Sequence, residues 1–596
     1  MCGIAGIVYK KDIPGNREAV LKSMLDSIAH RGPDDEGMYF DGPVALGHRR
    51  LSILDLSPAG HQPMKYKDWF IVYNGEVYNY LELREELKRS GHTFTTGTDT
   101  EVILHAYEEW GEECLSRFNG MWAFVIYDRR KQTLFCSRDR FGVKPFYYYE
   151  DDEKFLFASE IKAILRAGVQ AIPHREILED YLFLGLLNHK KETFFSGITK
   201  LMPSHRMLLS QRPFRQQVTR YYLITLARHR TGKDIREVVQ TIRDGLRRAV
   251  EYRLRSDVRV GSCLSGGLDS SSVVALAAGL TTKKNDFFAV TASSEDPEND
   301  ESTYAQRVAA HVGIRDIVVR PTYEDFCSAL EDVVYCQEEP FLSTSIFMQY
   351  FVMKTARENG IKVLLDGQGG DETLFGYETY FPQYLKMLIV NLSLLEALNF
   401  IRQVKNFKLS RWRMIRSALV TLVPKTLSHR VRLTRWRGNP YAKQAYLRNV
   451  DIFRNKSFKQ FQIDQITWLN VPQLVNYEDK NSMWFSVETR LPFLDYELVE
   501  KCVSLDDTLK VQRGFLKYIL RSAMDDMLPG DITWRTNKIG FESPQKKWFA
   551  QHREKMIPEI RSCELTADYL PYLDLKDGDP LWRVYNAALW SRISWK

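Results

Sequence analysis

The chain has 596 residues, enough for roughly two or three domains, and its apolar fraction of 44% is ordinary for a globular protein. Its eight cysteines show no paired metal-ligand spacing, which favours reduced thiols in a cytoplasm over a disulfide framework. No basic leader precedes an apolar run, and no stretch of about 18 apolar residues occurs, so we expect a cytoplasmic protein without an integral membrane segment.

The net charge of +7 is concentrated in one segment. Residues 401–460 contain 16 Lys and Arg against one acid, Asp451, a local charge of about +15, so the rest of the chain is acidic. Such a segment is either a solvated face or a site for an anionic partner, and both interpretations stay open. We expect no nucleic-acid partner.

The first 160 residues are rich in predicted strands. Short apolar or alternating runs predict them at Ile4–Tyr9, Phe70–Tyr73, Met121–Tyr127 and Thr133–Ser137. Two helical patterns interrupt these strands, at Arg17–Ile28 and Leu81–Ser90. The mixture predicts an α+β layered domain, which we place at residues 2–205.

Cys2 directly follows the initiator methionine. If Met1 is removed, as the small Cys2 side chain would allow, the thiol lies beside an α-amine whose pKa is near neutrality. One residue would then supply both a nucleophile and a base. Read alone, Met1-Cys2-Gly3-Ile4 is simply a strand beginning near a terminus, so this interpretation depends on other stretches.

Six motifs occur in a specific order along the first 142 residues. They are Met1–Gly6, His30–Asp34, His48–Ile53, Tyr73–Asn79, Gly97–Glu101 and Arg138–Gly142. Together they resemble the glutaminase domain of the N-terminal-nucleophile amidotransferases, in the version found in asparagine synthetases. The resemblance implies that Cys2 attacks the side-chain amide of glutamine, giving a glutamyl thioester and ammonia.

The resemblance also implies how glutamine is held. Arg50 would pair with its α-carboxylate, while Asp99 and Glu76 would receive its α-ammonium group. Asn74 and the Gly75 N–H would form the oxyanion hole. Without the family, Asn74-Gly75 is a turn dipeptide and Arg50 a surface cation.

Residues 160–250 connect this domain to the next. Loops and short strands are predicted first, and Ile235–Tyr252 then predicts an amphipathic helix. We place the boundary near residues 205–235, where Gln, Arg and Thr replace the apolar pattern. In the resembled family, ammonia passes through a channel between the two domains.

The stretch from Val258 to Leu276 has an anion-binding pattern. A short buried strand, a Ser-Gly-Gly turn and a helix start bring backbone N–H groups and a positive helix end together. The glycines permit close approach, the serines add hydroxyl donors, and Asp269 is placed to hold magnesium. The alternative is a Gly-Ser turn with a capped helix. The pattern suits a polyphosphate, whose expected contacts are Ser265, Gly266, Gly267, Asp269 and Ser270.

The segment Ser265–Ser270 lacks the lysine of the Walker loop. It resembles instead the pyrophosphatase loop of enzymes that adenylate a substrate and release pyrophosphate. Strands and helices alternate after it, at Asp286–Ala292, Ser302–Val312, Asp316–Arg320 and Ile361–Asp366. This alternation predicts an α/β parallel sheet with helices on both faces and ligands at the carboxyl ends of its strands.

A second constellation is Asp366-Gly-Gln-Gly-Gly-Asp-Glu372. Its acids Asp371 and Glu372 either place a metal ligand opposite Asp269, where a metal would neutralise phosphate charge, or cap the following helix. Resemblance to the asparagine synthetase domain implies Asp371 as the ligand. It also implies a nucleotide pocket lined by Leu264, Val290, Asp366 and Gly367.

This loop departs from the resembled family, whose usual sequence is Ser-Gly-Glu-Gly-Ser-Asp-Glu. Here the first position is Asp366 and the third is Gln368. Because an amide accepts no proton, any base for ammonia attack lies elsewhere or is unnecessary. The departure weakens the case for free aspartate as the acceptor.

Residues at about 380–470 are predicted to form a basic helical segment, in which the stretch Tyr384–Val404 is strongly apolar and the basic residues follow. As a hypothesis, this segment either holds an anionic acceptor, such as a nucleotide-sugar uronate, or rests on a membrane surface. Family motifs return at Tyr477–Met483, Ser486–Asp495, Gly514–Lys517 and Trp534–Pro544. In the last motif, Lys538 would stabilise phosphates in the transition state.

The sequence thus predicts a glutamine-dependent amidotransferase that uses ATP and Mg²⁺, with a synthetase domain at residues 235–596 and helical C-terminal additions. Its substrates would be glutamine and a carboxylate acceptor, and a homodimer is one expectation. Three alternatives stay open: asparagine synthetase acting on aspartate, amidation of another carboxylate on a cell-surface sugar or antibiotic precursor, and a non-catalytic regulatory binding protein. The retention of Cys2, Asp269, Asp371 and Lys538 argues against the last.

Overall fold

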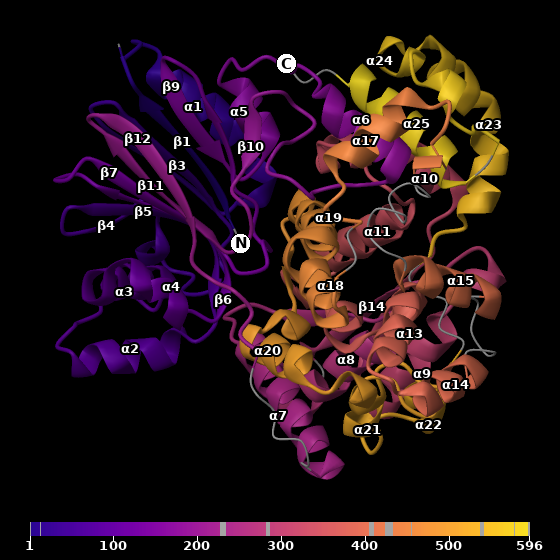
Figure 1. The fold of residues 1–596 in the computed structure, drawn as a ribbon. Coiled ribbons are helices and arrows are strands. Elements are labelled where there is room, and N and C mark those ends of the chain that lie inside the picture. The colour runs from indigo at the N-terminus through magenta and orange to yellow at the C-terminus, as the bar shows by residue number, and fades with distance from the viewer. Residues whose placement is uncertain are drawn as a thin grey trace.

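The structure is a computed structural model, and most of its N-terminal strands lie at one side of the molecule, opposite the helix-rich C-terminal region (Figure 1). It describes residues 2–11, 13–226, 234–281, 286–403, 410–422, 433–434, 436–453, 456–536, 542–576 and 578–593. No helix among these residues is long and apolar enough to cross a membrane.

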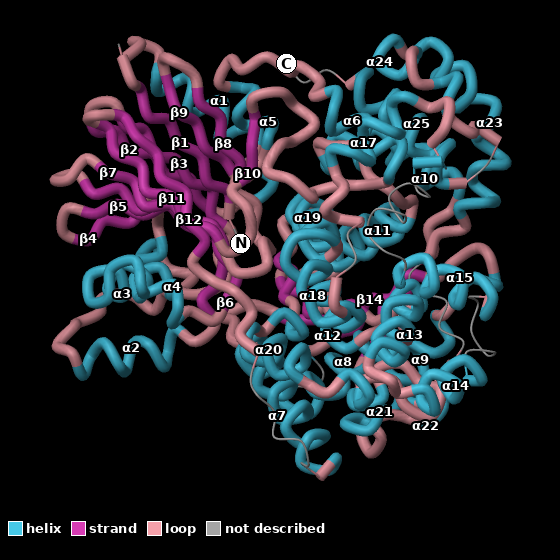
Figure 2. The backbone as a smooth tube through the Cα atoms, viewed as in Figure 1, coloured by secondary structure: helices cyan, strands magenta, loops and turns pink. Residues whose placement is uncertain are grey.

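Two six-stranded antiparallel sheets form the N-terminal region (Figure 2). Their strand orders are β10-β8-β9-β1-β3-β2 and β12-β11-β7-β6-β5-β4. The strands are β1 (Gly3–Tyr9), β2 (Asp35–Asp41), β3 (Val44–Arg50), β4 (Met64–Tyr66), β5 (Trp69–Val77), β6 (Gly120–Asp128), β7 (Thr133–Arg138), β8 (Tyr147–Glu150), β9 (Lys154–Ala158), β10 (Ile198–Lys200), β11 (His205–Gln211) and β12 (Phe214–Arg220).

The two sheets pack face to face between layers of helices. In β5, Phe70 and Val72 join a core shared with Ile4 and Val8 of β1, whereas Ile71 packs with the helices outside the second sheet. These helices are α2 (Tyr80–Arg89), α3 (Asp99–Trp110) and α4 (Cys114–Arg117), while α1 (Arg17–Ser27), α5 (Ile161–Arg166) and α6 (Arg175–Leu184) pack on the first sheet's side. The predicted α+β layered fold is confirmed.

The second N-terminal sheet extends beyond the limit that the sequence predicts for its domain. Strands β11 and β12 continue it past residue 205, as far as Arg220. We therefore propose that the first domain extends to Arg220 rather than to residue 205, which keeps the boundary within the predicted range of residues 205–235. The polar residues of β12 obscure the alternation because this edge strand is largely exposed.

A five-stranded parallel sheet organises the C-terminal region. Its order is β15-β14-β13-β16-β17, with β13 (Val260–Cys263), β14 (Phe288–Ala292), β15 (Arg315–Val319), β16 (Val363–Leu365) and β17 (Glu488–Arg490). One face packs on α7 (Ile235–Arg253), α8 (Leu268–Leu280), α9 (Ser302–Val312), α20 (Tyr496–Ser504) and α21 (Tyr518–Met524). The other packs on α11 (Ser345–Glu358), as a doubly covered sheet requires.

The C-terminal region contains further helices, as the prediction of helical additions expects, and several of them pack in the same cluster as α1, α5 and α6. The further helices are α10 (Tyr323–Gln337), α12 (Gly370–Leu374), α13 (Phe381–Val390), α14 (Leu394–Gln403), α15 (Arg411–Leu422), α17 (Pro440–Arg448), α18 (Phe458–Asp464), α19 (Val471–Trp484), α22 (Gly530–Thr533), α23 (Gln545–Ser562), α24 (Glu564–Ala567) and α25 (Asp579–Arg592). The apolar stretch after Tyr377 forms two helices, and Leu392 between them has a left-handed φ of 59°. Parts of the basic segment lie outside the described residues.

Buried ion pairs join the N-terminal and C-terminal regions. Arg31 is 0% exposed, donates to the carbonyl oxygen of Cys2 over 3.1 Å, and lies 2.9 Å from both Glu160 Oε1 and Asp479 Oδ2. Asp479, on α19, also lies 3.2 Å from the Nζ of Lys144. Because each buried charge depends on partners of opposite sign, removing one partner takes away part of the compensation of the others.

We predict that Arg31→Met lowers the free energy of unfolding by about 3–5 kcal/mol, because it leaves Glu160 and Asp479 buried without this partner. Chemical denaturation followed by tryptophan fluorescence measures the change. The control is Arg129→Met, which removes an exposed ion pair with Asp68 and should change stability little. Equal effects of the two substitutions would contradict a special role for the buried pair.

Candidate active sites

The first candidate site is built around Cys2, just before β1. The Cys2 side chain is largely buried, and its backbone N donates to the Oδ1 of Asn74 on β5 over 3.0 Å. Burial raises the pKa of the Cys2 thiol. The thiol is therefore protonated near neutral pH, and a neighbouring base is needed to make it a nucleophile.

A small cavity beside Cys2 brings the predicted glutamine contacts together. Its lining includes Arg50, Gly75, Glu76 and Asp99, which come from β3, β5 and α3. Asn74 does not line it, but its buried Nδ2 has no hydrogen-bond partner among the described residues. Asn74 and Gly75 lie within a strand, so the interpretation as a turn is wrong, and the Nδ2 group is available as a donor at Cys2.

The loop after β3 holds the guanidinium group of Arg50. It donates to the carbonyl oxygens of Ser57, over 2.8 Å, and of Asp55. A Cβ atom on Gly60 would lie 1.9 Å from Arg50 Nη2, so any other residue there would displace the guanidinium group from this position. Arg50 is a buried, oriented cation, and the surface interpretation is wrong.

Asp99 begins α3 and faces the same cavity. Its Oδ2 accepts hydrogen bonds from Tyr73 Oη and the Val77 N–H, each over 2.8 Å. Burial raises the pKa of the Asp99 carboxyl to about 6. Near neutral pH this carboxylate is ionised and suits a cationic group.

Glu76 connects the cavity to the C-terminal sheet. Its Oε1 lies 3.4 Å from the Nη2 of Arg490, on β17. The backbone carbonyl of Arg490 accepts the Asp366 N–H over 3.0 Å. One residue of the C-terminal sheet thus contacts an acid of the first cavity and the Asp366 loop.

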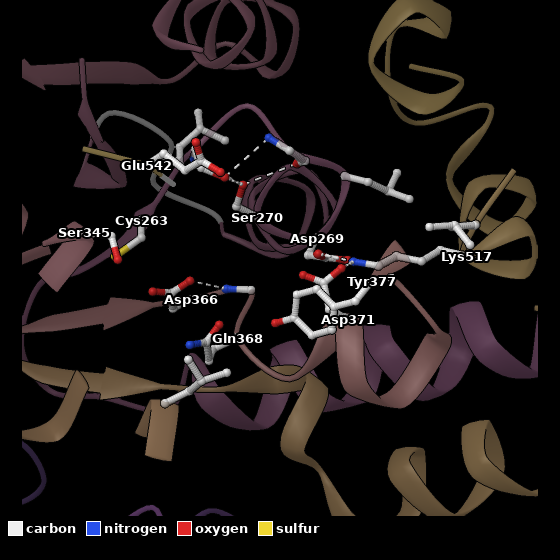
Figure 3. A pocket seen from close by; sticks show the side chains of 18 of the residues that line it. Cys263, Asp269, Ser270, Ser345, Asp366, Gln368, Asp371, Tyr377, Lys517 and Glu542 are labelled. Atoms are coloured by element: carbon white, nitrogen blue, oxygen red, sulfur yellow. Dashed lines mark hydrogen bonds and ion pairs between the residues drawn. The ribbon is translucent and has the colours of Figure 1, made fainter. Parts of the chain in front are cut away.

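The second candidate site is a cavity of about 620 Å³ at the carboxyl ends of the parallel strands (Figure 3). Its lining includes nine residues predicted from the sequence: Leu264, Ser265, Gly267, Asp269, Ser270, Val290, Asp366, Gly367 and Asp371. Gly266, which was also predicted, does not line the cavity; it lies in the turn between β13 and α8, where its backbone conformation favours glycine. Its φ is 71°, and a Cβ atom there would lie 2.7 Å from the Ala305 N of α9.

Two carboxylates of this cavity converge on one cation. The Lys517 ammonium group makes ion pairs with both Asp269 and Asp371 (Figure 3). Lys517 precedes α21 with a left-handed φ of 53°, a conformation that is unfavourable for lysine and is typical of functional sites. The motif Gly514–Lys517 predicts this helix start, but it does not indicate a role for Lys517.

The Asp366 loop separates its two adjacent acids. Asp371 lines the cavity, whereas Glu372 is turned away and accepts hydrogen bonds from Tyr377 Oη, over 2.8 Å, and Asn470 Nδ2, over 2.6 Å. Burial, with the neighbouring Asp371 charge, raises the pKa of Glu372 to about 7. At the other end of the loop, burial raises the pKa of Asp366 to about 6.

Some residues that line this cavity were not predicted as site residues from the sequence. They include Cys263, Ser345, Gln349 and Tyr377. Ser345 and Gln349 lie four residues apart and so share one face of α11. This spacing indicates a shared binding site only when α11 is known to cover the cavity. The predicted phosphate contact Lys538 lies outside the described residues.

Comparisons with known proteins agree with this two-site arrangement. Residues 1–222 match the glutamine amidotransferase domain, and residues 241–596 match asparagine synthase. The chain is 30% identical to asparagine synthetase (glutamine-hydrolyzing) 1 of Bacillus subtilis, over 96% of this chain and 91% of that protein. It is also 30% identical to asparagine synthetase (glutamine-hydrolyzing) 3 of that organism, over 100% and 95%. Amidase chyE of Penicillium rubens is 29% identical over 95% and 92%.

The fold and the two cavities define a two-site glutamine amidotransferase. The chain belongs to the asparagine synthase family and is a ligase of the glutamine-hydrolysing, asparagine-synthetase-like kind. This family implies the use of ATP, and the amidotransferase domain implies glutamine as a substrate.

We predict that Gly376→Ala weakens ATP binding at least tenfold, because the new Cβ atom would lie 1.7 Å from Asp371 Oδ1 and 2.2 Å from Lys517 Cε. Isothermal titration calorimetry measures the affinity. The matched control is Gly279→Ala, whose Cβ atom meets nothing within 4 Å and which should bind ATP normally. Normal binding by the Gly376 variant would contradict the placement of the nucleotide here.

Proposed function

We propose that the protein releases ammonia from glutamine at Cys2 and uses it to amidate an acceptor carboxylate that has been adenylated in the second cavity. The observation that carries this proposal is the convergence of Asp269 and Asp371 on the Lys517 cation within the 620 Å³ cavity. A site that already seats a cation between two carboxylates suits phosphate chemistry assisted by a divalent metal.

The first half-reaction uses the side chains around Cys2. After removal of Met1, the α-amine takes the thiol proton and the sulfur bonds to the amide carbon. The α-ammonium then returns that proton to the leaving nitrogen as the carbon–nitrogen bond breaks, which releases ammonia. The Asn74 Nδ2 and Gly75 N–H groups stabilise the oxyanion. Arg50 holds the α-carboxylate of glutamine, Asp99 and Glu76 hold its α-ammonium group, and water then hydrolyses the thioester to glutamate.

The second half-reaction activates the acceptor. A carboxylate oxygen of the acceptor bonds to the α-phosphorus of ATP as pyrophosphate leaves, and ammonia then displaces AMP to give an amide. The serine hydroxyls and backbone N–H groups of the Ser265 loop bind phosphate, and Lys517 and Lys538 offset its charge. Asp269 and Asp371 would hold Mg²⁺, which neutralises phosphate charge when bound.

We assign Asp366 as the proton acceptor when ammonia attacks. Gln368, which replaces the family glutamate, lines the same cavity but accepts no proton. The Asp366 carboxyl has a pKa of about 6, so it is ionised at neutral pH yet basic enough to take a proton.

Free aspartate and another carboxylate are the two acceptors to distinguish. Gln368 favours another carboxylate, because it removes the acid that the family usually places at this position. A non-catalytic regulatory protein would need neither the oriented Asn74 donor nor the two acids on Lys517, so we rank it last.

We predict that ATP–pyrophosphate exchange will occur with one class of acceptor from a panel of aspartate, other amino acids and uronate sugars. Exchange on aspartate alone would identify an asparagine synthetase that tolerates Gln368, whereas exchange on another carboxylate would identify a specialised amidotransferase. Asp269→Ala should abolish exchange, and Cys2→Ala should abolish only the use of glutamine, leaving ammonia as a nitrogen source. An absence of exchange with every acceptor would overturn the proposal.

We predict that Asp366→Asn lowers ammonia-dependent amide formation about 100-fold or more while exchange persists. In the unchanged enzyme, amide formation should rise as the pH increases through about 6, because the raised pKa of Asp366 leaves it protonated below that value. The double variant Asp366→Asn with Gln368→Glu supplies a carboxylate in the same cavity and should recover part of the rate. Parallel loss of exchange and amide formation would contradict the assignment.

A further inference from the structure

The outer surface of α14 and α15 carries the most exposed large apolar side chains of the described residues. Leu392 is 82% exposed, Trp412 is 81% and Leu395 is 77%, whereas the highest value elsewhere is 66%, at Leu223. We use the name α14–α15 surface for the following residues: Leu392, Leu394, Leu395, Leu398, Arg402, Arg411, Trp412, Arg413, Arg416 and Leu419.

Each of the two helices has a buried face and a second apolar face that is exposed. In α14, Ala397 and Phe400 are buried, while Leu394 and Leu398, four residues apart, are exposed together. A helix that only covers a core needs one apolar face, with polar residues opposite. The leucines of this outer face therefore require another explanation.

The outer face of α15 has the same organisation with added charge. Met414 and Ala418 are buried, whereas Trp412, Arg416 and Leu419 follow one another on the opposite side at helical spacing. Between residues 390 and 422 the sequence has one acid, Glu396, against six Lys and Arg. The exposed apolar groups are thus surrounded by net positive charge.

The two outer faces belong to one edge of the molecule. Helices α13, α14 and α15 lie together there (Figure 1), and their inner faces share a core that includes Tyr384, Phe400 and Met414. Phe375, four residues after Asp371, is part of that core. The surface is therefore built directly on the segment that leaves the second cavity.

The charge decides between two occupants of this surface. A symmetric contact with a second copy would bring two copies of the same positively charged surface together, which is electrostatically unfavourable. A bilayer with anionic lipids satisfies both components: leucines enter the boundary of the acyl chains, tryptophan lies at the headgroup level, and arginines meet phosphates. We propose that the α14–α15 surface docks the protein on an anionic membrane surface.

Docking of this kind is peripheral and does not depend on the acceptor or on the amidotransferase reaction. It would hold the segment after Asp371 close to the bilayer, so that the second cavity works next to the membrane. The hypothesis that the basic segment rests on a membrane thereby acquires specific residues, and an anionic acceptor is no longer needed to explain the exposed arginines.

The test is flotation of the full chain with vesicles of phosphatidylcholine alone or of an equal mixture with phosphatidylglycerol. We expect binding to the mixed vesicles, weak binding to the neutral ones, and weakening by salt. Replacing Arg411, Arg413 and Arg416 by Gln should lower the partition coefficient about fivefold per charge, roughly 100-fold in total. Leu395→Ser with Trp412→Ser should also reduce binding, through loss of apolar contact.

The controls carry substitutions of exposed residues elsewhere: Ile172→Ser with Leu223→Ser, which are 51% and 66% exposed, for the apolar pair, and Arg130→Gln, Arg215→Gln and Arg236→Gln together for the three charges. These variants should bind like the unchanged protein. The proposal is overturned if the controls lose binding equally, or if the surface variants keep it. It is also overturned if sedimentation shows a dimer that Leu395→Ser with Trp412→Ser dissociates, because the occupant is then a second copy.

Discussion

The buried guanidinium group of Arg490 is the interaction on which the arrangement of the two cavities depends. Its side chain pairs with Glu488, faces Glu76 of the first cavity, and donates to the carbonyl oxygens of Arg253 and Arg255. Its own carbonyl holds the N–H of Asp366. A buried cation needs several partners to offset its lost hydration. Because the partners of Arg490 come from several segments of the chain, they fix the position of β17 relative to both cavities.

Both cavities contain ionisable side chains that are buried from bulk water and still face the space where a substrate would bind. In the first, burial raises the pKa values of Cys2 and Asp99, and fixed donors hold the acid ready for a cation. In the second, two carboxylates share the Lys517 cation. Groups that are oriented before the substrate arrives lose little free energy to reorganisation when charge develops.

The α14–α15 surface differs from the two cavities, because its charged and apolar side chains are mostly exposed rather than buried. Its leucines and the side chains of Arg402, Arg413 and Arg416 remain in solvent, although the same helices have a well-packed inner face. Phe375 is part of that inner face and follows the loop of Asp371, so a docked α14–α15 surface would lie close in the chain to the second cavity.

Local patterns in the sequence were sufficient to predict several elements and most of the site. The bounds of α9 agree with the prediction, as does the start of α7, because apolar periodicity reports which face of an element is buried. The residue types of the Ser265 and Asp366 loops likewise determined which groups could meet a phosphate, since both loops follow strands of one parallel sheet.

Only the tertiary structure decided which of those groups meet. Asp269 and Lys517 are 248 residues apart, so only the tertiary packing of the C-terminal region brings them into contact. Strand β17 has three residues, two of them charged, so no periodicity distinguishes it until Arg490 is seen to have buried partners. The separation of Asp371 from Glu372, and the exposure of Leu392 and Trp412, are likewise set by neighbours distant in sequence, which local propensity does not encode.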